Sequence, residues 1–188
     1  MILPVVAYGH PVLKKIAEEI EPDYPGLQQL IADMFETMYH TEGVGLAAPQ
    51  INKSIRLFVI DAEPFHETYP EAKGFKKVFI NPEIVEVSEE TWTFNEGCLS
   101  LPDMHEDVVR PSKITINYLD ENFVEHEEEY DGVCARVIQH EYDHLEGKVY
   151  VDRVAPMRKM MLKNKLRNIS EGNVYVDYKM IFPNKRRR

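Results

Sequence analysis

The fold prediction rests on the stretch Gln139-His140-Glu141-Tyr142-Asp143-His144-Leu145-Glu146-Gly147. Apolar residues at helical spacing surround it, and Asp131-Gly132 and Gly147 supply a start and a stop, so the pattern predicts a buried central helix. His140 and His144 then lie one turn apart on one face, where two imidazoles can hold the same metal ion. Glu141 lies about 100° round the helix, close enough to deprotonate a water on that ion. The alternative is a solvated helix face that spells the motif by chance, and a third metal ligand decides against it.

A catalytic divalent metal site normally has three protein ligands and one open position, so the two histidines need a third partner. The chain has two cysteines. Cys134 lies on the predicted helix and faces another side from His140, which indicates a small buried apolar residue. Cys98 lies in Glu96-Gly97-Cys98-Leu99-Ser100, where Gly97 lets the backbone pass close to a ligand. Alone, Cys98 would be a packed or paired thiol. Beside the two histidines, it predicts a metal site of Cys98, His140 and His144.

The composition is that of a folded globular chain. Of 188 residues, 44% are apolar and 29% are charged, which suits one domain with a substantial core. No apolar run reaches membrane-spanning length and no signal-peptide core follows Met1, so we predict no membrane partner. Two irregularly spaced cysteines make no disulfide framework, and a thiolate ligand requires reducing surroundings, so we predict a cytoplasmic protein.

The charge of the chain is unevenly distributed. Residues 157–188 contain ten Lys and Arg against Glu171 and Asp177, so this region carries about +8 in a chain whose net charge is −10. Such asymmetry indicates a basic appendage with an acidic partner. We therefore divide the chain into a single catalytic domain, residues 1–155, and a basic C-terminal region, residues 156–188, packed on the domain or partly free. The basic region is predicted to contain a helix over residues 157–168, a strand over residues 174–181 and the tail Lys185-Arg186-Arg187-Arg188.

The remaining patterns predict an α+β fold with antiparallel β-sheets surrounding the central metal-binding helix. Pro25 opens an amphipathic helix that runs to His40. Strand-like runs then follow one another without intervening helices, which favours antiparallel pairing over a doubly wound parallel sheet. These runs are residues 55–60, 78–81, 84–87, 113–119 and 124–129. Between the first helix and these runs, Gly43-Val44-Gly45-Leu46-Ala47-Ala48-Pro49-Gln50 is either a ligand-binding backbone segment with Gln50 as a donor or a tight buried turn.

Three blocks of this sequence resemble, in order and in form, the signature motifs of the peptide deformylase family. They are residues 43–50, 96–100 and 139–144. The resemblance extends over about residues 5–155 and includes Gly9-His10-Pro11-Val12-Leu13. It implies antiparallel sheets around a central helix, and a metal-dependent hydrolase that removes the formyl group from the N-formylmethionine of nascent polypeptides. N-formylmethionyl peptides would be the substrates and formate a product.

The resemblance also implies a role for each site residue. The metal ligands would be Cys98, His140 and His144, and Glu141 would be the general base and acid. Gln50 and the backbone N–H of Leu99 would form the oxyanion hole. Substrate would be held by the backbone at Gly45 and Gly97 and by an apolar pocket for the methionine side chain, lined by Val44, Val133 and Val137. The motifs do not fix Arg136, His105 or the long loop of residues 63–77, all of which bear on substrate preference.

The donor set predicts one divalent metal ion per chain and suits Zn²⁺, Fe²⁺, Ni²⁺ or Co²⁺. The resemblance implies Fe²⁺ as the physiological ion. Two other functions share the predicted helix. A zincin-like metallopeptidase would complete the site with a downstream carboxylate such as Glu171 and would leave Cys98 unused. A structural zinc module would need four protein ligands, and no fourth is evident.

The basic C-terminal region has two interpretations. Some relatives dock on the ribosome through their C-terminus, so the resemblance implies a contact with ribosomal RNA, dominated by phosphate charge. The other interpretation is a solvated helix face with a frayed tail, since basic runs are often no more than that.

Overall fold

The computed structural model describes residues 1–184 and has the predicted α+β fold. Its helices are α1 (Leu27–His40), α2 (Gly132–Leu145), α3 (Pro156–Met161) and α4 (Lys163–Glu171). Its strands are β1 (Val5–Val6), β2 (Gly45–Ala47), β3 (Leu57–Asp61), β4 (Lys76–Val87), β5 (Thr91–Cys98), β6 (Leu101–Pro111), β7 (Lys113–Leu119), β8 (Glu125–Asp131) and β9 (Met180–Ile181). The predicted tail of residues 185–188 lies outside the described residues.

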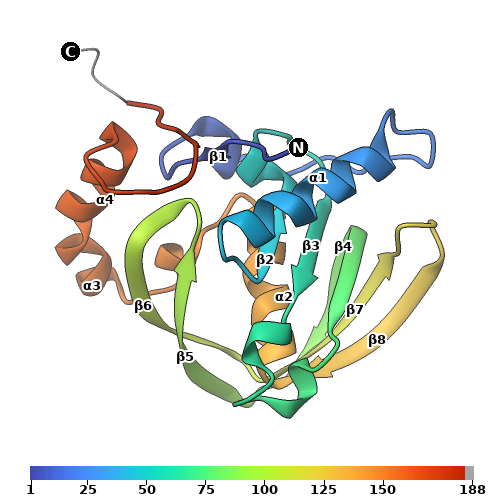
Figure 1. The fold of residues 1–188 in the computed structure, drawn as a ribbon. Helices are drawn as coiled ribbons and strands as arrows, with labels where there is room; N and C mark the ends of the chain where they lie inside the picture. The colour runs from blue at the N-terminus through green and yellow to red at the C-terminus, as the bar shows by residue number, and fades with distance from the viewer. Residues whose placement is uncertain (185–188) are drawn as a thin grey trace.

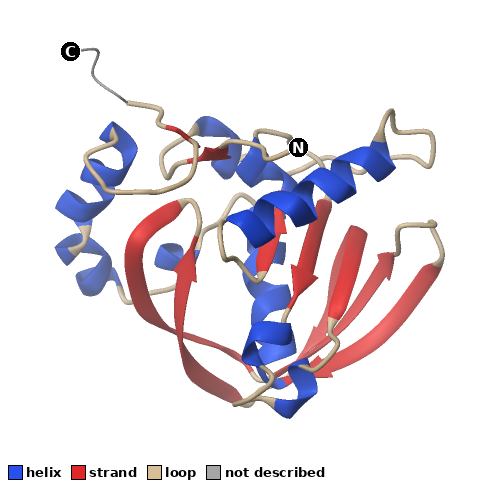
Figure 2. Cartoon of the chain, in the orientation of Figure 1, coloured by secondary structure: helices blue, strands red, loops and turns tan. Residues whose placement is uncertain are grey.

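The central helix α2 lies between two antiparallel sheets. One sheet has the strand order β2-β3-β4-β7-β8, and the other is the β5–β6 hairpin. Figure 1 shows α2 enclosed by these strands, with α3 and α4 beside β6. Figure 2, coloured by element type, shows α2 running between the strands of the two sheets. A short parallel pair, β1 with β9, joins the two ends of the described chain. Within the described part, no helix is both long and apolar enough to cross a membrane.

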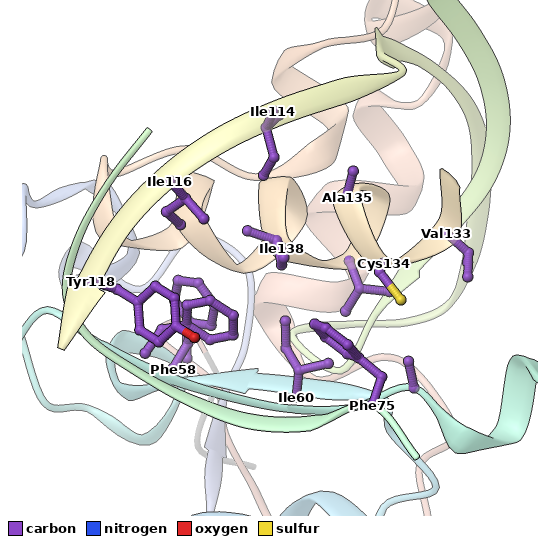
Figure 3. Packing of buried hydrophobic residues seen from close by; sticks show 14 of the residues in the cluster. Phe58, Ile60, Phe75, Ile114, Ile116, Tyr118, Val133, Cys134, Ala135 and Ile138 are labelled. Carbon is purple, nitrogen blue, oxygen red and sulfur yellow. The ribbon is translucent and has the colours of Figure 1, made fainter. Parts of the chain in front are cut away.

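The core forms around α2 because this helix is buried on all sides. Every residue of α2 except Gly132 and Tyr142 is buried. Figure 3 shows Cys134 and Ile138 pointing toward the β3 residues Phe58 and Ile60, which belong to the same apolar cluster. Each aliphatic or aromatic side chain fully buried in this way stabilises the fold by roughly 1.5–3 kcal/mol. The motif with His140 and His144 is therefore carried on the most completely buried of the described helices. Cys134 is a buried thiol in this core, as predicted, and burial raises its pKa to about 11.

Several elements differ in extent from the prediction. Helix α1 begins at Leu27 rather than Pro25, because Gly26 adopts a left-handed φ of 68° and serves as the N-cap. The two runs of residues 78–81 and 84–87 form one strand, β4, which continues through a register shift between Ile80 and Glu83. Asn81 sits at that irregularity with a φ of 47°. A bulge of this kind interrupts the alternation that marks a strand in the sequence.

Strand β6 was not predicted. Its residues alternate between buried and exposed over residues 103–110, but the buried positions include Glu106 and Arg110. Charged residues at inward positions hide the period-two pattern of hydrophobicity on which strand prediction depends. Their burial requires partners, and those partners lead to the site described below.

The C-terminal region also differs in detail. The single helix predicted over residues 157–168 is divided at Leu162 into α3 and α4. Leu162, Leu166 and Ile169 are buried in a cluster with residues of β6, so the region packs on the rest of the chain. Of the strand predicted over residues 174–181, only Met180–Ile181 pairs, with β1. The residues before it run along the surface of the molecule toward the site.

Candidate metal centre and active site

Three predicted donors converge at the end of β5 and on one face of α2. Cys98 Sγ lies 3.4 Å from His144 Nε2, and the donor atoms of Cys98, His140 and His144 all lie within 4.8 Å of one another. A shift in strand register between Gly97 and Cys98 turns the thiol toward the helix. A thiolate and two imidazoles at this separation fit one divalent ion with an open position.

Glu96 fixes the orientation of the first histidine. Its Oε1 lies 2.8 Å from His140 Nδ1, so that nitrogen donates and the lone pair of Nε2 is left for a metal ion. Arg110 contacts both oxygens of Glu96, at 2.7 and 2.9 Å, and Arg136 contacts Oε2 at 2.8 Å. Burial alone would raise the pKa of Glu96, but the hydrogen bonds from His140 and Arg110 hold it well below its usual range. The carboxylate is therefore charged, and both of its oxygens hold neighbouring side chains in position, including His140.

The same buried ion pairs extend to the second turn of the motif. Arg110 also donates to Asp143 Oδ2 at 2.7 Å, and Arg153 donates to Asp143 Oδ1 at 2.7 Å. Asp143 lies on α2 beside His144, so the network ties β5, β6 and both metal-binding turns together. Removing one partner from such a network leaves a buried charge uncompensated, which typically costs about 3–5 kcal/mol. Sequence reasoning did not assign Glu96, Arg110 or Asp143 to the site; the signal available was an arginine at an inward strand position.

The protonation states of His144 and Glu141 suit their predicted roles. Burial lowers the pKa of His144 to about 3, so its imidazole is neutral and can act as a ligand. Burial raises the pKa of Glu141 to about 7, in the range where a carboxyl group exchanges protons at neutral pH. Glu141 Oε2 is buried without a hydrogen-bond partner among the described residues. Gly45 leaves room for this carboxylate, since a Cβ there would lie 2.5 Å from Glu141 Oε1.

Gln50 is held with its amide N–H₂ directed at the donor cluster. Its Oε1 accepts a hydrogen bond from Ala47 N at 2.9 Å, which sets the orientation of the amide. Its Nε2 lies 3.4 Å from Cys98 Sγ and 3.3 Å from Ser100 Oγ. A buried, oriented donor of this kind is what an oxyanion hole requires.

The comparisons with known proteins agree on one family. The model of the polypeptide deformylase family matches residues 2–160. A peptide deformylase of Christiangramia forsetii is 53% identical over 191 residues, which cover 98% of this chain and 97% of that protein. The crystal structure of a peptide deformylase from Legionella pneumophila superposes with a TM-score of 0.79 at 40% identity, over 92% of this chain and 98% of that one. A peptide deformylase 1B of Arabidopsis thaliana, in complex with an inhibitor, gives a TM-score of 0.80 at 30% identity, over 91% and 92% of the two chains.

The chain belongs to the peptide deformylase family. It is a hydrolase that removes the formyl group from the N-formylmethionine of nascent polypeptides, so the predicted family, fold and reaction are confirmed. Peptide deformylases use a divalent metal ion, and the donor set of Cys98, His140 and His144 fits one. The zincin-like alternative is not supported, and its proposed ligand Glu171 does not line the cavity at the site.

The deformylase site opens into a cavity of about 560 Å³. Most residues that the sequence assigned to the site line it: Val44, Gly45, Gln50, Gly97, Cys98, Leu99, Val137, His140 and Glu141. His144 lies behind them, fully buried. The imidazole of His105 lies directly against Gly97, and a Cβ there would lie 2.5 Å from it. His105 therefore covers the backbone of the second motif at the mouth of the deformylase cavity.

Val133 lies apart from this lining. It is fully buried in the core cluster against the sheet and is not among the residues that line the cavity. It lies on the same face of α2 as Val137, one turn nearer the start of the helix. Arg136 does line the cavity, yet its guanidinium donates hydrogen bonds to Glu96 and to the carbonyl oxygens of Trp92 and Val108. It therefore holds the surrounding structure in position. Sequence reasoning missed the lining residues Phe65, Phe94, Tyr175 and Tyr178, which carry no motif.

Proposed function

We propose that this deformylase holds one divalent ion with Cys98, His140 and His144 and uses Glu141 as general base and acid. The observation that carries the proposal is the convergence of three donors with an unpartnered, buried carboxylate at the floor of one cavity. When bound, the ion acidifies a water molecule and polarises the formyl carbonyl, which a formamide requires because it is a poor electrophile. Glu141 accepts the proton of the attacking water and delivers it to the departing amine.

Gln50 and the backbone N–H of Leu99 are proposed to stabilise the tetrahedral state. As water attacks, negative charge develops on the formyl oxygen, and donors already oriented toward it need no rearrangement. The hydrogen bond from Ala47 supports this role for Gln50, since it keeps the amide nitrogen facing the cavity.

The substrate is proposed to lie against the backbone at Gly45 and Gly97. Both glycines line the cavity, and a Cβ at either position would lie 2.5 Å from a side chain, that of Glu141 at Gly45 and that of His105 at Gly97. Val44 and Val137 line the same cavity and supply apolar surface for the methionine side chain. Val133 contributes by packing beneath this surface.

Fe²⁺ is proposed as the physiological ion, because a thiolate with two imidazoles binds it and leaves an open position. We expect the anaerobically loaded Fe²⁺ form to release formate from a formyl-methionyl tripeptide and to lose activity in air through oxidation of the metal and of Cys98. The Ni²⁺ form should survive at least about tenfold longer. The measurement is the half-life of formate release in air for both forms. Equal half-lives would count against Fe²⁺, whereas no formate release from either form would reject the proposed reaction chemistry.

The basic C-terminal region is proposed to contact ribosomal RNA while the enzyme works in the cytoplasm, where reducing conditions preserve the Cys98 thiolate. In the structure, Arg158 and Lys159 are paired with Glu106 and Asp152. Three cations of α4 are exposed and form no ion pair with the described residues: Lys163, Lys165 and Arg167.

Reversing two of these charges tests the ribosome contact. We expect Lys163→Glu with Arg167→Glu to weaken co-sedimentation with ribosomes at low salt, because phosphate contacts dominate such binding. Binding of the parent chain should itself fall at least about tenfold between 50 and 200 mM salt. The matched control is Lys14→Glu with Lys15→Glu, an exposed pair outside the region. Co-sedimentation that is unchanged both by salt and by the double substitution in α4 would reject the ribosome contact. The proposed catalytic roles would be unaffected by that result.

A further inference from the structure

The chain returns to the active site after α4. Residues 175–178 line the cavity, although they lie beyond residues 2–160, to which the family model is matched. The segment is anchored on both sides of this contact. Before it, Val174 packs on the cluster around α4, and after it, Met180–Ile181 pairs with Val5–Val6. Figure 1 shows β9 lying beside β1, close to the β5–β6 hairpin. The segment is therefore an ordered wall of the cavity.

Tyr178 makes a specific contact from this wall. Its hydroxyl donates a hydrogen bond of 2.7 Å to the backbone carbonyl of Leu99. Leu99 lies in the tight connection of the β5–β6 hairpin, where Cys98 pairs directly with Leu101. The next carbonyl in this connection, that of Ser100, accepts a hydrogen bond of 2.8 Å from Tyr8 N. The carbonyls of Leu99 and Ser100 are thus held by segments near the two ends of the described chain, which β1 and β9 join.

We propose that Tyr178 is a positioning residue for deformylation. By holding the Leu99 carbonyl, it fixes the backbone of the Cys98–Leu101 connection and so aims the Leu99 N–H at the formyl oxygen. This inference rests on the proposed oxyanion role of Leu99. Tyr178 does not act on the substrate itself, because its hydroxyl proton is already donated within the protein. A misplacement of a donor by a fraction of an ångström is enough to slow the chemical step.

The test is Tyr178→Phe, which removes the hydroxyl and keeps the ring that lines the cavity. We expect kcat for a formyl-methionyl tripeptide to fall about tenfold while KM changes less than about twofold, because the donor acts on the transition state. Metal content should stay at one ion per chain. In a readout independent of turnover, amide hydrogen exchange within residues 98–101 should accelerate about 2- to 10-fold, as expected for the loss of one hydrogen bond.

The matched control is Tyr118→Phe. Tyr118 is also mostly buried and also donates through its hydroxyl, to Glu128 Oε2 at 3.1 Å, but it does so on the five-stranded sheet away from the cavity. This variant should leave kcat and exchange in residues 98–101 unchanged. An unchanged kcat in Tyr178→Phe, or a fall matched equally by Tyr118→Phe, would overturn the inference. Its failure is distinguishable from failure of the proposed function, because only the latter would leave Glu141→Gln active.

Discussion

Glu141→Gln is expected to keep about one metal ion per chain and to lose at least about a hundredfold in kcat, since acid–base catalysis of this kind contributes about 10²- to 10⁴-fold. Glutamine has the same shape and fits the space that Gly45 leaves beside the carboxylate. It cannot take a proton from water at neutral pH. The metal donors are unaffected, because His140 and His144 are held by the fold and by Glu96 rather than by Glu141.

Cys98→Ala is the informative counterpart to that variant. It removes one of three donors, so both bound metal and turnover should be lost. The two quantities to measure are metal per chain, by elemental analysis after desalting, and formate released from a formyl-methionyl tripeptide. A Glu141→Gln protein that works at the parental rate, or that loses its metal as Cys98→Ala does, would contradict the separation of base from ligand.

Gln50→Ala carries the second large effect. We expect kcat to fall at least about a hundredfold, since one oxyanion donor is typically worth about 2.7–4 kcal/mol of transition-state stabilisation. Metal content should not change, because Gln50 is outside the donor set of Cys98, His140 and His144. A rise in KM with kcat preserved would instead make Gln50 a contact to the ground state. The control is Gln28→Ala on α1. It removes an exposed side-chain amide that donates a hydrogen bond to the carbonyl oxygen of Glu121, and the variant should behave as the parent.

The sequence was most informative where the spacing of residues within one short segment determined the structure. Residues 132–145 carry both the buried faces and the paired histidines of α2, so the helix and its two candidate donors follow from spacing alone. The third candidate donor followed because Cys98 is the one cysteine outside that helix, and the structure places it beside the two histidines. These predictions needed no knowledge of which strands pair.

The remainder of the site depends on contacts distant in sequence. Glu96 pairs with Arg110 across the β5–β6 hairpin and with Arg136 on α2. No local sequence pattern predicts that these charged residues are buried together. Tyr178 reaches Leu99 across 79 residues. The alternation of residues 174–181 predicted a strand. The structure shows these residues alternating between half-buried and exposed, but only the last two, Met180 and Ile181, pair with another strand.

The buried ion pairs around Glu96 and Asp143 imply a particular relation between this protein and its metal. Glu96, itself held by Arg110, orients His140, and the complete burial of His144 on α2 fixes the second imidazole. The contacts of the protein itself thus orient both imidazoles. Such a site presents the same three donor atoms to Fe²⁺, Zn²⁺, Ni²⁺ or Co²⁺. The ions then differ only in their intrinsic affinities for this donor set. We therefore expect the ion found in the isolated protein to depend on the supply during growth and purification, and we expect one ion to replace another without refolding of the chain.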